Sequence, residues 1–156
     1  RRNNTPSLIQ RNFYAYHEEF GVPTDIARQV RDGEEIDITT SRVNCIWLDD
    51  ILDLMMASAK LCSVPCDILN MTGTQTFSVT DIAARLGQYM GKEPRFKGEP
   101  SETNLLGKAA KMARLLWEPP TALDEGLKRL AESVMAYEHP LDHPTEWEKR
   151  DKFGES

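Results

Sequence analysis

The stretch DILNMTGTQTFSVTDIAARLGQYM, residues 67–90, carries the clearest fold signal in the chain. Its first five residues, Asp67–Met71, are apolar in the manner of a buried strand, and the Thr-Gly-Thr at 72–74 turns the chain. Ser78, followed three residues later by Asp81, indicates the N-terminal cap of a helix, which Gly91 ends. A strand that passes through a short turn into a helix is the building unit of an α/β fold.

The same alternation extends in both directions from this stretch. The patterns predict strands over 7–15, 36–40, 43–48 and 95–96, and helices over 21–32, 51–61, 105–116 and from about 121 to 137. Asp50 is expected to cap the helix over 51–61 by accepting backbone N–H groups. Only 7–15 and 67–71 are apolar enough for the middle of a parallel sheet, and two isolated strands rarely hold together alone. The chain therefore looks like part of something larger.

Length and composition bound the class of protein. The 156 residues fit one domain, which we place at 1–138, and the charged, proline-containing segment 139–156 is expected to be a solvated tail. A formal charge of −6 argues against a nucleic-acid partner, because phosphate neutralisation needs clustered Lys and Arg. No apolar run approaches the ~18 residues of a membrane span, and the chain starts with RRNNTP rather than a signal peptide. We expect no membrane partner and a cytoplasmic location.

The cysteines and histidines show no metal-site spacing. The three cysteines stand at 45, 62 and 66, and no second Cys or His pair completes a zinc site, so all three are expected to be buried thiols. His139 and His143 are each followed by a proline, which favours an extended segment that would keep their imidazoles apart. The sequence therefore predicts no metal site.

Five segments, in order, resemble the C-terminal portion of the NAD-dependent epimerase/dehydratase family, the extended short-chain dehydrogenase/reductases. They are 9–14 (IQRNFY), 21–27 (GVPTDIA), 44–50 (NCIWLDD), 70–83 (NMTGTQTFSVTDIA) and 111–127 (KMARLLWEPPTALDEGL). The resemblance implies an α/β fold in which the last core strands of a Rossmann-type dehydrogenase are followed by a small mixed helix/strand substrate domain.

The resemblance also implies what the chain lacks. In the family, NAD or NADP exchanges a hydride with the substrate while a Tyr, with a Lys four residues later, moves the proton. None of the four tyrosines here has such a lysine, and no Gly-rich dinucleotide turn is present. We expect no catalytic or cofactor-binding residue in this chain, which alone would bind neither NAD nor NADP. The intact parent protein would be the enzyme, and it would act on a sugar-type or nucleotide-sugar-type substrate.

Two positions depart from the family pattern. The family's Asn two residues after the core Arg, which faces substrate, falls on Phe13, and Asn12 stands one place earlier. The family's Arg seven residues before the matched Asp50, which grips a pyrophosphate, falls on Val43, and Arg42 stands one residue early. A one-residue shift on a strand reverses the face of a side chain, so Arg42 would reach an anion from the loop end or be merely exposed. Asn12, Phe13 and Arg42 remain candidate substrate contacts in an atypical member.

Three more candidates follow from topology. Tyr14, Tyr16 and His17 lie at the end of the strand predicted over 7–15, and ligands of open α/β sheets bind beyond the carboxyl ends of strands. A lone His in a loop can also be simply solvated. Trp47 and Trp117 are expected to pack between helices and sheet.

Two readings from other classes compete with this one. Residues 77–90 resemble the first helix and turn of a helix-turn-helix, but the recognition helix that should follow is broken by Gly91 and Pro94. The chain is alternatively a degenerate, non-enzymatic family member that acts as an interaction module. The strand over 7–15 would then expose an edge that a homo-oligomer, or pairing with a cofactor-binding half, would cover. In the enzyme reading, the partner is a small-molecule substrate.

Overall fold

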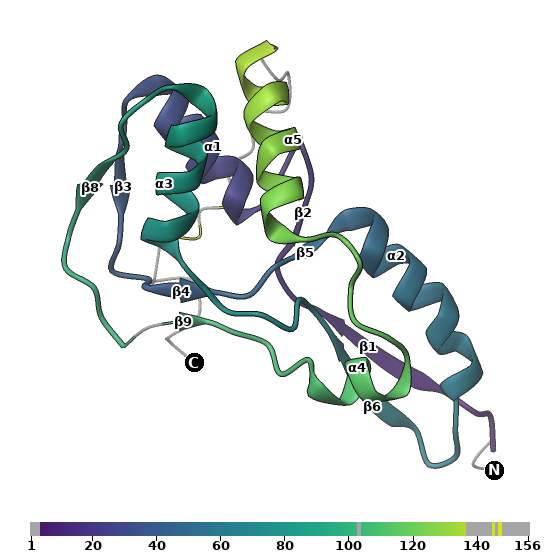
Figure 1. The fold of residues 1–156 in the computed structure, drawn as a ribbon. Helices are drawn as coiled ribbons and strands as arrows, with labels where there is room; N and C mark the ends of the chain where they lie inside the picture. The colour runs from purple at the N-terminus through teal and green to yellow at the C-terminus, as the bar shows by residue number, and fades with distance from the viewer. Residues whose placement is uncertain (1–3, 103, 137–144, 146, 148–156) are drawn as a thin grey trace.

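The computed structural model describes residues 4–102, 104–136, 145 and 147, and it has a mixed α/β architecture. Figure 1 shows a group of helices above a set of short strands, with a further helix running beside the strands nearest the N-terminus. The elements, in order, are β1 (Leu8–Asn12), β2 (Ala15–Tyr16), α1 (Val22–Asp32), β3 (Glu35–Asp37), β4 (Arg42–Val43), β5 (Ile46–Trp47), α2 (Leu48–Ala57), η1 (Ser58–Leu61), β6 (Asp67–Met71), β7 (Phe77–Ser78), α3 (Val79–Met90), β8 (Arg95–Lys97), β9 (Asn104–Leu105), α4 (Ala110–Leu115) and α5 (Leu123–Ala136).

The strands pair in four small sheets. β1 pairs with β6, β2 with β5 and β3 with β8, each time in parallel. β4 is the middle strand of the fourth sheet, antiparallel to β7 and parallel to β9. The predicted strand at Asp67–Met71 is confirmed, and its parallel partner is β1, the other run that the sequence marked as apolar.

The single strand predicted over 7–15 is wrong, because the chain changes partner in the middle of it. Phe13 N still donates to Met71 O (3.0 Å), but Ile46 N donates to Tyr14 O (3.3 Å) and the chain continues as β2 beside β5. Tyr14 makes the change in a left-handed conformation, φ 52°, which non-glycine residues seldom adopt. The strand predicted over 43–48 divides in the same way into β4 and β5.

Local signals placed two helices correctly. α1 carries a proline in its first turn and ends at Gly33, which is left-handed at φ 70°. α3 begins at Ser78, whose hydroxyl accepts from Asp81 N (3.0 Å), and ends at the left-handed Gly91.

The predicted cap at Asp50 is wrong. α2 begins at Leu48, so Asp50 lies within the first turn and the residue before the helix, Trp47, makes no side-chain cap. The Asp50 carboxylate instead accepts two hydrogen bonds from Thr121, one from its backbone N and one from its Oγ1, both 2.9 Å long. Asp50 therefore ties α2 to the segment that leads into α5.

The helix predicted over 105–116 is also wrong in its first half. Residues 104–105 form β9, and Gly107 N donates to the side chain of Asn44 (2.9 Å), which holds the backbone in a non-helical path. The helix α4 starts only at Ala110.

Two apolar cores hold these elements. The first lies among α1, α3 and α5, which pack against one another (Figure 1), and includes Ile26, Leu86 and Leu130. The second lies between the β1–β6 pair, α2 and α4, and includes Leu54 and Leu69. Trp47 belongs to the first core as expected, whereas Trp117 is 40% exposed and the prediction that it packs inside is wrong.

The β1–β6 pair has one face that the described chain leaves bare. Ile9 and Ile68 are register partners and so point to the same side, where they are 49% and 38% exposed. On the opposite side, Gln10 Nε2 donates to Met55 O of α2 (3.0 Å). We call the side with Ile9 and Ile68 the open face. Within the described residues, β1 also has no strand on its outer edge.

Two positions of the predicted solvated tail lie within the described residues: Thr145, which is exposed, and Trp147, which is partly buried. Thr145 bonds to Asp25 of α1, and Trp147 packs against the first core. His139 and His143 lie outside the described residues. Across the described part of the chain, every helix is too short or too polar to cross a membrane.

Candidate functional site

A cleft of about 620 Å³ opens over the sheet that contains β4. Most of the residues that line it are polar, with a single arginine among hydroxyl and amide side chains. The residues are Ile38, Ser41, Arg42, Ser78, Thr80, Pro100, Ser101, Glu102, Asn104 and Leu106. We call it the Arg42 cleft.

The sheet register brings the polar side chains of the Arg42 cleft together. Arg42 of β4 stands opposite Ser78 of β7 and opposite Asn104 of β9. Residues that are opposite one another in neighbouring strands point to the same face of a sheet, so all three face the cleft. The adjacent Val43 points the other way into the first core, where it is fully buried. The one-residue shift seen in the sequence therefore leaves Arg42, rather than a residue at 43, on the cleft side.

Hydrogen bonds fix the walls of the Arg42 cleft. Ser41 Oγ donates to Ser101 O (2.5 Å), and Ser101 Oγ donates to Thr39 O (2.6 Å), which ties the segment after β8 to the segment before β4. Val79 N donates to Ser41 O (3.0 Å) and joins the start of α3 to the same wall. The cleft is thus held in shape from three sides.

One group in the Arg42 cleft, the guanidinium of Arg42, favours an anion. Arg42 is exposed, and within the described part of the chain its guanidinium has no hydrogen-bond or ion-pair partner. Ser78 and Thr80 belong to the start of α3, where the helix dipole also attracts negative charge. Glu102, which also lines the cleft, and Asp81 in the first turn of α3 carry the opposite charge and oppose this attraction. A planar guanidinium with hydroxyl and amide donors around it suits the oxygens of a phosphate.

Tyr16 and His17 lie elsewhere. Tyr16 is 2% exposed, and its ring meets that of Trp47 edge-on with centroids 5.2 Å apart; burial raises the pKa of its hydroxyl. His17 also lies near Trp47, with ring centroids 5.4 Å apart, and its Nε2 is 2.6 Å from a Glu18 carboxylate oxygen. The guanidinium of Arg129 lies 5.4 Å from the centroid of the same tryptophan ring. Tyr16 is chiefly a core residue, and His17 lines a separate, shallow groove beside α5.

The three remaining candidates surround the crossing between β1 and β2. Asn12 is exposed at the end of β1, and Phe13 is half-buried against Gly107. Tyr14 is half-buried with its ring centroid 6.1 Å from that of Phe13, and desolvation raises the pKa of its hydroxyl. The six candidate residues therefore occupy separate places, and only Arg42 lies in the Arg42 cleft.

Sequence reasoning missed the residues that complete this cleft and the one that anchors it. Asn44, 4% exposed, donates from Nδ2 to Gly73 O (2.9 Å) and to Gly107 O (2.8 Å), and its Oδ1 accepts from Gly107 N (2.9 Å). These bonds hold three chain segments together beside β4 and β9. A lone Asn between two short apolar runs was the only local signal for this role.

The cysteines do not form a cluster. Cys45 is buried, and desolvation raises the pKa of its thiol to about 12. Cys62 and Cys66 are exposed, so the expectation of three buried thiols is wrong for these two. A search of the described residues finds no group of His, Cys, Asp and Glu side chains that could hold a metal ion.

Comparisons with known proteins give a likeness of fold. No model of a protein family matches the chain, and no curated protein matches it. Among solved structures, UDP-glucuronic acid 4-epimerase from Bacillus cereus, in complex with UDP-glucuronic acid and NAD, is similar with a TM-score of 0.70 and 18% identity over 86% of this chain and 47% of its own. UDP-glucose 4-epimerase from Thermus thermophilus, in complex with NAD, gives 0.66 and 14% over 83% and 47%.

A third similar structure is RMD from Pseudomonas aeruginosa complexed with NADPH, with a TM-score of 0.66 and 15% identity over 83% of this chain and 48% of its own. The chain thus spans about half the length of the solved structures that it matches. The likeness confirms the expected fold class: a mixed α/β fold that matches the C-terminal part of Rossmann-type epimerase structures.

Proposed function

We propose that this chain is the substrate-side part of an NAD(P)-dependent epimerase/dehydratase, and that its Arg42 cleft holds the phosphate groups of a nucleotide-sugar-type substrate. The observation that carries the proposal is the convergence of Arg42, Ser78 and Asn104 on one face of a three-stranded sheet. The fold likeness to an epimerase bound to UDP-glucuronic acid supports the same substrate class. The other five candidates lie outside this cleft and are then not direct phosphate contacts: Asn12, Phe13, Tyr14, Tyr16 and His17.

The chemical step belongs outside this chain. An acid/base tyrosine needs a lowered pKa, which a neighbouring Lys charge provides. Burial raises the pKa of both Tyr14 and Tyr16, and a hydrogen bond to the Asp124 carboxylate raises that of Tyr89. The proton transfer and the NAD or NADP site would therefore lie in the rest of the parent enzyme, which we expect in the cytoplasm. The cofactor would supply the hydride, and this chain would orient the substrate.

The open face offers the surface on which that other part would dock. Ile9, Ile68 and the unpaired edge of β1 together expose apolar side chains and backbone hydrogen-bonding groups. A cofactor-binding half would cover both. The same surface also favours the second candidate, an interaction module that associates with its own copies, and light scattering distinguishes the two. A concentration-independent monomer argues against self-association.

Binding calorimetry with UDP and uridine tests the proposed cleft. UDP carries the phosphates that Arg42 would grip, so it should bind at least tenfold more tightly than uridine, since a hydrogen bond to a charged group contributes about 1.5–3 kcal/mol. Arg42→Ala should remove most of this difference. Arg114→Ala removes an equal charge from an exposed position on α4 and should leave it unchanged. Equal binding of UDP by the wild type and the Arg42 variant would refute phosphate binding in the Arg42 cleft. Micromolar binding of NAD(P)H to this chain would refute the proposal that the cofactor site lies in another part of the parent enzyme.

A further inference from the structure

A second, smaller cavity of about 220 Å³ lies between the turn after β6 and the start of α5. We call it the Tyr16 pocket, and its walls are formed by Tyr16, Phe77 and residues 45–47, 73–75 and 118–123. Phe77 and Ser78 are neighbours in β7, so they point to opposite faces of its sheet. Phe77 lines the Tyr16 pocket and Ser78 lines the Arg42 cleft, and the two sites are therefore separate.

The hydroxyl of Tyr16 is a polar group without a partner in a buried side chain. Tyr16 is 2% exposed, and within the described part of the chain its hydroxyl makes no hydrogen bond. The oxygen is not completely enclosed by protein atoms, so it opens to the pocket that the residue lines. Buried tyrosine hydroxyls usually find a hydrogen-bond partner, because leaving one unpaired is costly. A molecule bound in the pocket would supply the missing partner.

The chain gives up helix propensity to make room for this hydroxyl. Gly126 lies near the start of α5, and a Cβ at that position would be 2.2 Å from the Tyr16 oxygen. Glycine weakens a helix relative to alanine. A phenylalanine at position 16 would fill the same place in the core without requiring that glycine. Core packing alone therefore does not account for the hydroxyl.

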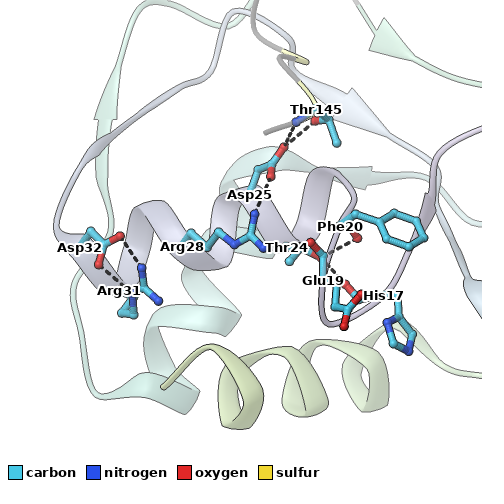
Figure 2. Close-up of polar contacts among 9 residues, drawn as sticks. All are labelled: His17, Glu19, Phe20, Thr24, Asp25, Arg28, Arg31, Asp32 and Thr145. Atoms are coloured by element: carbon cyan, nitrogen blue, oxygen red, sulfur yellow. Dashed lines mark hydrogen bonds and ion pairs between the residues drawn. The ribbon is translucent and has the colours of Figure 1, made fainter. Parts of the chain in front are cut away.

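Two walls of the Tyr16 pocket are held in place by bonds outside it. β2, which carries Tyr16, pairs with β5, and Thr24 Oγ1 donates to the backbone carbonyl of the next residue, His17 (2.6 Å; Figure 2). On another side, the Asp50 carboxylate holds Thr121 by two hydrogen bonds of 2.9 Å. Walls that are already ordered lose little entropy when a ligand binds.

The residues around the pocket suit an uncharged molecule that carries hydroxyl groups. The described residues that line it include no Lys, Arg or His, and their one carboxylate, that of Glu118, belongs to an exposed side chain. Thr74 and Gln75 offer a hydroxyl and an amide, while Phe77 and Pro119 offer flat apolar surfaces. Pockets for drug-sized ligands have volumes of roughly 300–1,000 Å³, so this smaller pocket has room for a single ring.

We propose that the Tyr16 pocket binds one uncharged sugar ring, with the Tyr16 hydroxyl donating a hydrogen bond to a sugar oxygen. Phe77 and Pro119 contact the C–H groups of the ring, and Thr74 and Gln75 bond to its hydroxyl groups. Burial raises the pKa of Tyr16, which keeps the phenol protonated as a donor at neutral pH. The site does not depend on the Arg42 cleft or on the proposed function.

Titration of the full 156-residue chain with D-glucose, followed by NMR of the backbone amides, tests the pocket. Glucose should shift the amides of residues 73–77 and 121–123, with a Kd in the low-millimolar range that is usual for so small a ligand. Tyr16→Phe keeps the ring and removes only the hydroxyl, so it should weaken binding about fivefold. Gln75→Ala changes an exposed side chain of the wall and should weaken binding about threefold.

Tyr89→Phe is the matched control, because it removes a phenolic hydroxyl that lies outside the pocket and should leave the Kd for glucose unchanged. Without glucose, Tyr16→Phe should have a Tm at least as high as that of the wild type, since its hydroxyl has no protein partner to lose. The absence of amide shifts at 73–77 in ~100 mM glucose would overturn the proposal. Equal affinity of the wild type and Tyr16→Phe would also overturn it, and so would a lower Tm of Tyr16→Phe, which would show that the hydroxyl serves the fold.

Discussion

Replacing Asp50 by alanine removes the link between α2 and the start of α5. Asp50 is 6% exposed, and its two carboxylate oxygens accept separately from the backbone N and the Oγ1 of Thr121. The alanine variant leaves the Thr121 N–H without this acceptor, at a point where the chain turns into the last helix.

The size of the loss follows from these two bonds. A hydrogen bond to a charged group contributes about 1.5–3 kcal/mol, and relief from burying the Asp50 charge offsets part of the sum. We expect the free energy of unfolding to fall by about 3 kcal/mol. For a chain of this length, that corresponds to a decrease in Tm of roughly 6–12 °C.

Urea denaturation followed by circular dichroism measures this change. Asp53→Ala is the matched control, because Asp53 is an exposed aspartate on the same helix, and it should change stability by less than about 0.5 kcal/mol. In a double-mutant cycle with Thr121→Val, the two losses should be non-additive by at least about 1 kcal/mol. The reasoning fails if Asp50→Ala is no worse than the Asp53 control, or if the cycle is additive.

Three further perturbations test other parts of the structure. A Cβ at Gly126 would lie 2.2 Å from the hydroxyl oxygen of the buried Tyr16. Gly126→Ala should therefore lower the free energy of unfolding by about 1–2 kcal/mol in thermal denaturation, and Tyr16→Phe in the same chain should restore part of that loss. Burial raises the pKa of Cys45 to about 12, so the folded state keeps a proton that the unfolded chain loses above about pH 8.5. This stabilisation is full below that pH and is lost as the pH rises towards 12. Between about pH 7 and pH 10, the free energy of unfolding measured in urea should therefore fall by roughly 2 kcal/mol more in the wild type than in Cys45→Ala. A hydrogen bond from Lys111 lowers the pKa of Asp67, so Lys111→Met should raise that pKa towards its usual range in an NMR titration of the carboxyl carbon, and an unmoved titration would contradict the pairing.

Local chemistry was enough to predict the elements whose ends are decided by near neighbours. The Ser78 cap and the left-handed Gly33 and Gly91 act within three or four residues of a helix end, and those helix ends are where the sequence placed them. Asp50 shows the limit of the same reasoning. Its position before an apolar run is typical of a cap, but its partner is Thr121, 71 residues away.

The candidate site also combines a feature that the local sequence predicts with contacts that it does not. The sequence indicated that Arg42 stands one residue from the position expected from the resemblance, and alternation along β4 decides that it faces away from the core. Its neighbours Ser78 and Asn104 come from strands of two residues each, and such strands have too few side chains to reveal their register. The change of partner at Tyr14 was hidden for a similar reason, since nothing in the strand-like run 7–15 marks where one sheet ends and another begins.

The pairing of β1 with β6 also sets an order of events during synthesis. Leu8 is opposite Asp67 and Asn12 is opposite Met71, so β1 leaves the ribosome 59 residues ahead of its partner. At about 5–20 residues per second, translation takes roughly 3–12 s to supply that partner. During this interval the apolar side chains and backbone groups of β1 lack their native strand. The first of the described strands to be made is therefore accessible to a chaperone while the chain is still being synthesised.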